Sequence, residues 1–182
     1  MRQILVFFFL LSAFSMTSDA AWDPIKKSRD PDTGASQKTI VALEAFKEIP
    51  ELQPFFEQAD GFAVFPNVAK AGIGIGGAGG KGEVFQNGKV IGSTSLKQIS
   101  IGFQLGGQAF MEIIFFKEQR DTDRFTEGNF EFGAQASAVL IKQGVSVETA
   151  YSNGIAVFTI AKGGLMYEAS IGGQKFRFES YE

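Results

Sequence analysis

Four lysines around a glycine-rich stretch are the residues whose types and spacing point most directly to binding chemistry. Lys70 and Lys81 flank this stretch, and Lys97 and Lys162 lie at further predicted strand ends. If these ends meet at one edge of a sheet, their ammonium groups are placed to contact a phosphate. Lysines at strand ends also act simply as solvated charges that protect the edge from pairing, and this alternative stays open.

The chain lacks the side chains on which many enzyme mechanisms depend. Its 182 residues include no histidine and no cysteine, which excludes a Ser-His-Asp triad, a cysteine nucleophile, a Cys/His zinc site and a disulfide. Two carboxylate pairs remain, Asp121 with Asp123 and Glu127 with Glu131. They lie in a polar connection with no apolar surroundings to raise a pKa, so we expect them to be solvated. The sequence therefore predicts a non-enzymatic protein without a metal or cofactor.

The glycine-rich stretch runs from Gly72 to Gly82 and contains the spacing G-x-G-x-x-G three times. A dinucleotide site needs a helix directly after these glycines, whereas the next residues, Glu83-Val84-Phe85 and an Asn-Gly turn, are typical of a strand. A P-loop is excluded because glycine, not Ser or Thr, follows Lys81. We therefore expect no nucleotide at this stretch.

A strand with glycine at alternate positions explains the same pattern. Gly72, Gly74 and Gly76 would leave room on the outside of the sheet for another layer or backbone. Ile73 and Ile75 would then face the core. The room beside the glycines is also what a lipid tail or headgroup needs, so these glycines are candidates for lining a groove.

The charge balance and the first twenty residues bear on partners and location. Seventeen basic and twenty acidic residues give a formal net charge of −3, which argues against binding nucleic acid by bulk positive charge. Residues 1–20 combine one arginine, an apolar run too short to span a membrane, and small residues before a cleavage position at Ala20-Ala21. This is typical of a signal peptide, so we expect a periplasmic or secreted protein.

The remaining chain divides into a leader and a single domain. Residues 21–35 are polar and carry two prolines, which predicts a leader or linker. Its Trp22, Lys26, Lys27 and Arg29 either touch a membrane interface or belong to a disordered segment. Residues 36–182 are enough for one domain with its own core.

Two helices are expected at the start of this domain. Apolar residues recur at helical spacing from Ile40 to Ile49, with Ser36 as the N-cap and with Pro50 either ending this helix or opening the next one. A second short helix follows and ends at Asp60-Gly61. The apolar stripe of the first helix fits the core better than a membrane surface, although both remain open.

After Gly61 the pattern changes to strands. Gly61 to Phe65 is a short apolar run that Pro66-Asn67 closes, and Asn87-Gly88 predicts a tight hairpin turn between Lys81–Gln86 and Lys89–Ile91. Further strands are expected at 98–106, 110–116, 130–141, 146–151, 155–161, 165–171 and around Phe176 and Phe178, with one helical turn near Phe125. The expected fold is α+β, with N-terminal helices before a large, curved, mostly antiparallel, glycine-rich sheet that is open or closed into a barrel.

Several motifs resemble the SYLF domain family in the family's order. Residues 58–82 resemble its opening signature, "A-x-G" followed by an apolar run, "F-P" and "K-a-G", and residues 100–108 resemble its "G-x-Q-x-G-x-Q" strand. Residues 132–136, 151–158 and 162–173 are similar to later segments, so the resemblance extends from about Ser36 to Phe178. The chain departs from the family in lacking its "W-s-x-P" segment, where Gly92–Lys97 stands instead, and in having no SH3 domain.

The resemblance implies a lipid-binding module. Eukaryotic members of the family bind phosphoinositide membranes, yeast relatives also bind actin, and bacterial members are exported envelope proteins. For an exported single domain, the resemblance does not extend to actin regulation. We expect binding to lipid or to an anionic membrane surface, through a groove lined by glycine and a few lysines. The alternative is an envelope scaffold that binds another protein through an exposed sheet edge.

Overall fold

The computed structural model describes residues 29–102, 108–128, 130–132, 150–161 and 173–181. The predicted signal peptide, Trp22, Lys26, Lys27 and Lys162 lie outside these residues. So do the expected strands at 165–171, most of those at 130–141 and 146–151, and the end of the one at 98–106. Ala150 is helical and Tyr151 is irregular, so the prediction that the strand at 146–151 extends through these two residues is wrong.

Two helices form the N-terminal part, as the apolar spacing predicts. Helix α1 (Gln37–Lys47) begins at Ser36, whose side chain accepts a hydrogen bond from the backbone N–H of Thr39. A short 3₁₀ helix, η2 (Pro50–Leu52), leads into α2 (Gln53–Gln58). Proline favours the first position of a helix because its fixed φ suits the first turn and it has no N–H to leave unpaired.

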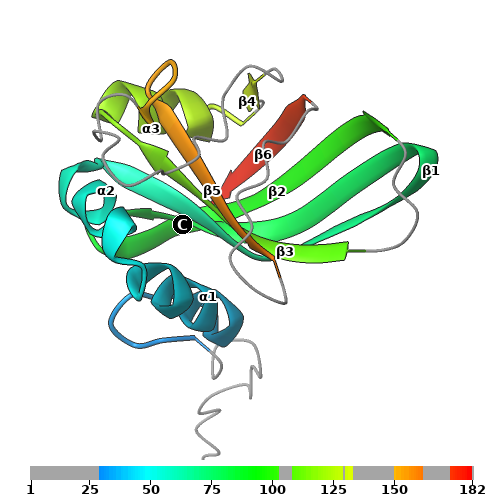
Figure 1. Ribbon diagram of the computed structural model, residues 1–182. Helices are drawn as coiled ribbons and strands as arrows, with labels where there is room; N and C mark the ends of the chain where they lie inside the picture. The colour runs from blue at the N-terminus through cyan, green and yellow to red at the C-terminus, as the bar shows by residue number, and fades with distance from the viewer. Residues whose placement is uncertain (1–28, 103–107, 129, 133–149, 162–172, 182) are drawn as a thin grey trace, which may run out of the picture.

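Six strands form one antiparallel sheet among the described residues. They are β1 (Gly61–Gln86), β2 (Lys89–Gly102), β3 (Gln108–Phe116), β4 (Phe130–Phe132), β5 (Ile155–Ala161) and β6 (Gln174–Ser180). Their order in the sheet is β4-β6-β2-β1-β3-β5 (Figure 1). With the helices at its N-terminal side, this curled sheet confirms the predicted α+β fold.

Strand β1 is long because it runs out and turns back on itself (Figure 1). Its outgoing arm, residues 61–70, pairs with β3, and its returning arm, residues 77–86, pairs with β2. The two arms approach so closely that a Cβ on Gly61 would lie 2.8 Å from the carbonyl oxygen of Phe85, and one on Gly82 would lie 2.5 Å from that of Val64. Glycine at these positions is therefore a steric requirement of the bent sheet.

The boundaries of the first strands differ from the prediction. Pro66-Asn67 does not end a strand but forms an irregularity within β1, between Phe65 and Val68. Proline is tolerated at such a bulge, where no ladder hydrogen bond is required of it. Lys81 consequently lies in the middle of a strand and not at its start. The Asn87-Gly88 turn is confirmed, with φ of 52° and 75° at the two residues.

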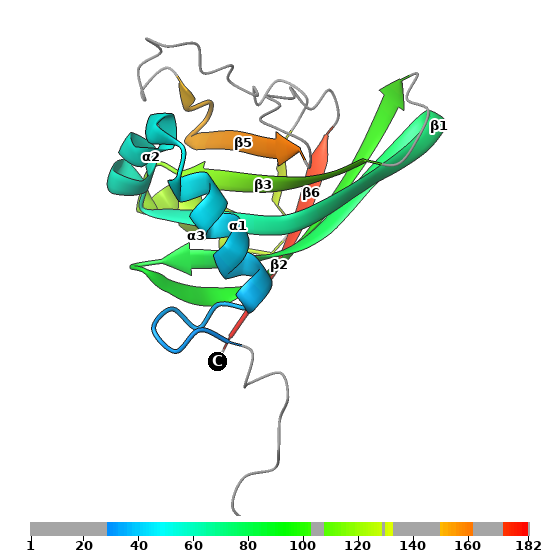
Figure 2. The same cartoon turned by 60° about the horizontal axis from the view of Figure 1, so that its bottom comes forward.

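The sheet buries apolar side chains on both faces. One core cluster joins α1 and α2 to the sheet through residues such as Phe46, Phe55 and Phe115, and we call this the outer face (Figure 2). The other cluster, on the inner face, gathers Phe65, Phe125 and Phe176 with their neighbours. Alternate residues of one strand thus serve two cores, which explains the many phenylalanines.

Helix α3 (Gln119–Thr126) packs on the inner face through Phe125, which is fully buried. Its ring lies 4.7 Å from that of Phe116 and 5.2 Å from that of Phe176, measured between centroids. The helix thereby links β3 to β6, which are not neighbours in the sheet. The one helical turn expected around Phe125 is thus a complete short helix.

Candidate functional site

A groove of about 660 Å³ lies on the outer face of the sheet, beside the N-terminus of α1. The returning arm of β1 contributes residues 79–83, and β2 contributes Ser93 and Ser95 to Lys97. Ser36, Lys38 and Thr39 line the groove from α1, and Tyr181 lines it from the C-terminal end. Gly79 leaves its backbone uncovered in the groove, whereas the Cβ positions of Gly80 and Gly82 point toward the outgoing arm of β1.

Hydrogen bonds around Glu83 fix one rim of the groove. The Glu83 carboxylate accepts hydrogen bonds from Arg29 Nη1 at 2.9 Å and from the backbone N–H of Ser36 at 2.8 Å. Arg29 also donates to the Tyr181 hydroxyl at 2.8 Å and lies over the Tyr181 ring. The hydrogen bond to Tyr181 raises the pKa of Arg29 most, and burial opposes it. Electrostatic attraction to Tyr181 and to the Glu83 carboxylate, with the hydrogen bond to Glu83, adds to the increase. The two ends of the described domain are therefore tied together at the groove.

Cationic side chains lie in adjacent rows across the outer face. Lys97 pairs with Gly79 on one side and with Lys175 of β6 on the other. In the next row, Ser95 pairs with Lys81 and Arg177. Neighbouring strands lie about 4.8 Å apart, so these four cations form one patch on a single face. We call Lys81, Lys97, Lys175 and Arg177 the basic patch.

Three of these four cations have no acidic partner among the described residues. Lys175 forms an ion pair with Glu131 at 3.1 Å, in an exposed position. Lys81, Lys97 and Arg177 form no ion pair with a described residue, and all three are exposed. Ile99 follows two residues after Lys97 on the same face and is 71% exposed. The patch thus has an apolar side chain at its border.

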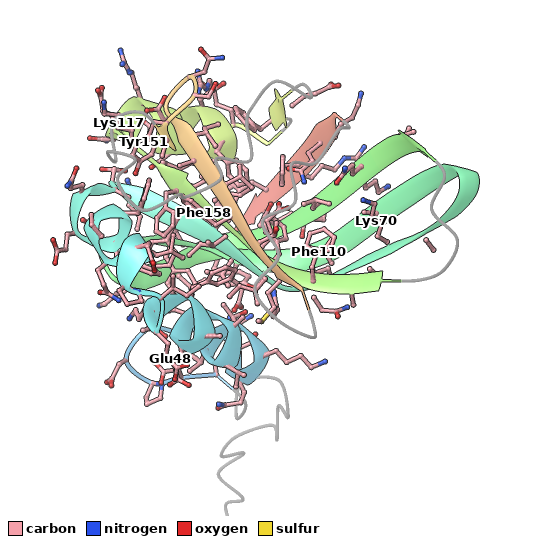
Figure 3. All side chains as sticks on the ribbon, viewed as in Figure 1. Glu48, Lys70, Phe110, Lys117, Tyr151 and Phe158 are labelled. Carbon is pink, nitrogen blue, oxygen red and sulfur yellow. The ribbon has the colours of Figure 1, made fainter. Side chains whose placement is uncertain are left out.

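The structure brings together two of the four lysines singled out in the sequence. Lys81 and Lys97 both line the groove. Lys70 follows the buried Val68 by two residues and therefore lies on the inner face, 9% exposed. Figure 3 places it, with Phe110, at the end of the sheet away from the three helices. Lys175 and Arg177 were not singled out, although alternation with Phe176 and Phe178 indicated their common face.

The glycines that line the described groove lie later in the chain than Gly72, Gly74 and Gly76, which the sequence predicted to line one. Gly72 and Gly74 belong to the bend of β1, where the side-chain surroundings lie outside the described residues. Gly76 precedes the buried Ala78 by two residues and so shares the inner face. The glycines that line the described groove come later, from Gly79 to Gly82.

A smaller hollow of about 340 Å³ lies at the opposite end of α1. Phe56, Phe62 and Phe85 line it, with Asp60 at the rim. Asp60 accepts hydrogen bonds from Thr122 at 2.7 Å and from Gln86 at 2.8 Å. Its carboxylate thereby joins α3 to the β1–β2 end, which is a structural role.

The interior of the curved sheet contains a buried polar cluster that the sequence analysis did not assign. Glu112 is fully buried on β3, and Gln98 and Gln174 are 4% and 1% exposed. Gln174 Nε2 donates hydrogen bonds to Glu112 Oε2 at 3.1 Å and to Gln98 Oε1 at 3.2 Å. Burial raises the pKa of Glu112 to about 7, against the opposing effect of the hydrogen bond from Gln174. In the sequence, the sign of this buried cluster is one glutamate, Glu112, within the otherwise apolar strand 110–116.

The predicted solvation of the acidic pairs is wrong for Asp121, which is 4% exposed. Its carboxylate completes the capping box of α3 with Glu118 and pairs with Arg124 at 3.3 Å. Asp123, Glu127 and Glu131 are exposed, as expected. The described residues contain no group of three or more acidic side chains suited to a metal ion. Within this part of the chain, the helices are also too short or too polar to cross a membrane.

Comparisons with known proteins agree with the motifs. Residues 97–182 match the family Ysc84, described as Las17-binding protein actin regulator. Beta cell expansion factor A from Aeromonas veronii is 27% identical over 136 residues, which cover 74% of this chain and 51% of that protein. The chain therefore spans about half the length of this curated relative. With the SYLF motifs in order along a curled, helix-flanked sheet, the chain is similar to the SYLF (Ysc84) family, and the family match covers residues 97–182.

Proposed function

We propose that this protein is a non-enzymatic binding protein that attaches to anionic lipid surfaces through its outer face. The observation that carries this proposal is the basic patch, four cations in adjacent rows beside a groove with a glycine backbone floor. An anionic phospholipid surface attracts each nearby lysine or arginine by about 1 kcal/mol. The groove offers space for part of a headgroup next to that charge.

Like charges on neighbouring strands support an anionic partner. Lys97 and Lys175 are directly paired across β2 and β6, an arrangement that is unfavourable without compensating negative charge. Glu131 compensates Lys175, and Arg29 already engages Glu83. A phosphate placed over Lys81 and Lys97 would supply the missing compensation.

The exposed Ile99 supports a membrane over a small soluble anion. It extends from the same face as Lys97, where it is available to enter the apolar boundary of a bilayer. Cations combined with an exposed apolar side chain are characteristic of proteins that bind at a membrane interface. The signal-peptide pattern of residues 1–20 adds that this membrane is reached after export to the periplasm or beyond.

Co-sedimentation with vesicles tests the proposal. The mature protein, beginning at Ala21, is mixed at low salt with vesicles of phosphatidylcholine alone or with added phosphatidylglycerol. We expect binding to the anionic vesicles and its loss at high salt. Charge reversal at both Lys81→Glu and Lys97→Glu removes two attractive cations, about 2 kcal/mol, and lowers the affinity at least roughly thirtyfold.

A matched double variant controls for net charge. Lys89 and Arg120 are exposed residues outside the patch, at the β1–β2 turn and on α3. The variant Lys89→Glu with Arg120→Glu carries the same change in charge and should retain most of the binding. Equal loss in both double variants would contradict the assigned face. Absence of wild-type binding to every vesicle composition, with no lipid found in the purified protein, would refute lipid binding itself.

A further inference from the structure

The buried hydrogen bond between Glu112 and Gln174 spans the interior of the sheet. Glu112 belongs to β3 and Gln174 to β6, and both arms of β1 together with β2 lie between these strands. Four strand spacings would separate them by about 19 Å in a flat sheet. The observed Nε2–Oε2 distance of 3.1 Å therefore exists only while the sheet is curled. The contact acts as a closure between distant strands.

The hydrogen bonds of this closure are incomplete while Glu112 is ionised. Gln174 Nε2 uses its two hydrogens on Glu112 Oε2 and on Gln98 Oε1. Gln174 Oε1 and Glu112 Oε1 are both buried and have no hydrogen-bond partner in the described part of the chain. Each is an acceptor when Glu112 carries its charge, so neither oxygen can satisfy the other. One proton on Glu112 Oε1 would supply the donor that this pair lacks.

Among the described residues, no cation of the surrounding elements compensates the carboxylate. Lys70 of β1 is the charged group that shares the inner face, and it forms no ion pair with Glu112 among the described contacts. The charged residues of α3 on this side, Asp121 and Arg124, pair with each other. From β2, β5 and β6, the polar residues on the inner face are Gln98, Thr94, Thr159 and Gln174, all uncharged. Burial therefore favours the neutral carboxylic acid, consistent with the raised pKa of about 7.

We propose that Glu112 and Gln174 form a proton-dependent clasp, in which a protonated Glu112 donates to Gln174 Oε1 while Gln174 Nε2 donates to Glu112 Oε2. Gln98 holds the Gln174 amide in the orientation that this reciprocal pair requires. Loss of the proton leaves a buried charge facing an acceptor oxygen. The clasp then weakens, and the β6 side of the curled sheet opens more readily.

The direction of the effect follows from linkage. A carboxyl whose pKa is about 7 when the sheet is closed and near its ordinary 4.5 when open retains its proton better in the closed form. The closed form is therefore most favoured below about pH 4.5 and loses this advantage progressively up to about pH 7. With these two pKa values, the equilibrium constant for opening the sheet should be roughly tenfold larger at pH 8 than at pH 6.

Hydrogen exchange and carboxyl titration test the clasp. After correction for the intrinsic pH dependence of exchange, β6 amides of the wild-type protein should open roughly tenfold more at pH 8 than at pH 6. In Glu112→Gln, the new amide makes both hydrogen bonds without a titrating proton, so the increase should disappear. In ¹³C-glutamate-labelled wild-type protein, one side-chain carboxyl signal should titrate near neutral pH and be missing from the variant.

Glu44→Gln is the control, because Glu44 is an exposed glutamate on α1. It should keep both the neutral titration and the exchange response. The proposal is overturned if every glutamate of the wild-type protein titrates below about pH 5.5, which requires no variant to fold. It is also overturned if Glu112→Gln retains the exchange response, or if Glu44→Gln abolishes it.

Discussion

Replacement of Gly82 by alanine should destabilise the protein, whereas the same change at Gly79 should not. Both glycines lie on the returning arm of β1, and neither has a positive φ. A Cβ on Gly82 would lie 2.5 Å from the carbonyl oxygen of Val64 and 2.7 Å from Cδ1 of Phe65. A Cβ on Gly79 would lie 3.5 Å from the nearest atom, the carbonyl oxygen of Leu96, which is an ordinary contact. The two variants thus differ in space and little else.

The size of this difference in stability depends on which atoms must move to admit a Cβ at Gly82. Phe65 is fully buried, with its ring 5.7 Å from that of Phe176, so neither it nor the adjacent backbone arm shifts freely. Added volume in such a packed core costs about 1–3 kcal/mol. Gly79→Ala gains about 0.4–1 kcal/mol by restricting the unfolded chain. The restriction of the unfolded chain is the same for both variants and cancels, so we expect Gly82→Ala to be less stable than Gly79→Ala by about 1–3 kcal/mol.

Urea unfolding followed by circular dichroism measures this difference directly. The midpoint should fall for Gly82→Ala and remain equal or rise for Gly79→Ala, with similar slopes if the unfolded states are alike. If Gly82→Ala proved as stable as Gly79→Ala, the two arms of β1 would not pack as described. The explanation of the glycine stretch by close backbone approach would then be wrong.

Three further predictions concern the core, a strained turn and pH. Phe125→Ala should cost about 3–5 kcal/mol in thermal or urea unfolding, while Val41→Ala, 56% exposed, should stay within about 0.5 kcal/mol. Gly154→Ala should lower the free energy of unfolding by about 2 kcal/mol or more, because φ is +80° there and the new Cβ would collide with the Asp121 carboxylate. Gly88→Ala should lower it less, because φ is a similar +75° but the new Cβ would meet open space. Wild-type stability should lose about 3 kcal/mol between pH 4.5 and pH 7 relative to Glu112→Gln, and parallel curves in urea would contradict the buried acid.

Local sequence signals predicted the elements that depend on neighbouring residues. Ser36 as N-cap, Pro50 at the next helix start and Asn87-Gly88 at the hairpin each act within a few residues of the chain. Alternation likewise placed Phe176 and Phe178 on one face and their charged neighbours on the other. Period and turn chemistry are properties of short segments, so they can be read without the tertiary structure.

The site depended on contacts between distant segments. Glu112 and Gln174 are 62 positions apart in the sequence, and Lys97 and Lys175 are still further apart, so only strand order and register bring each pair together. The bend of β1 moved Lys81 from a predicted strand end to the centre of a face. Asp121 became buried because α3 packs against the sheet.

By itself the sequence determined the likeness to the SYLF family, the order of the described helices and strands, and the lack of histidine and cysteine chemistry. Those features follow from residue type and from spacing along the chain. Tertiary structure decided which charges share a surface and which carboxylates leave water, because both depend on how far the sheet curls. The glycine stretch depends on both sequence and tertiary structure. Its composition is a property of the sequence, but the close backbone approach that requires Gly82 exists only once the two arms of β1 fold together.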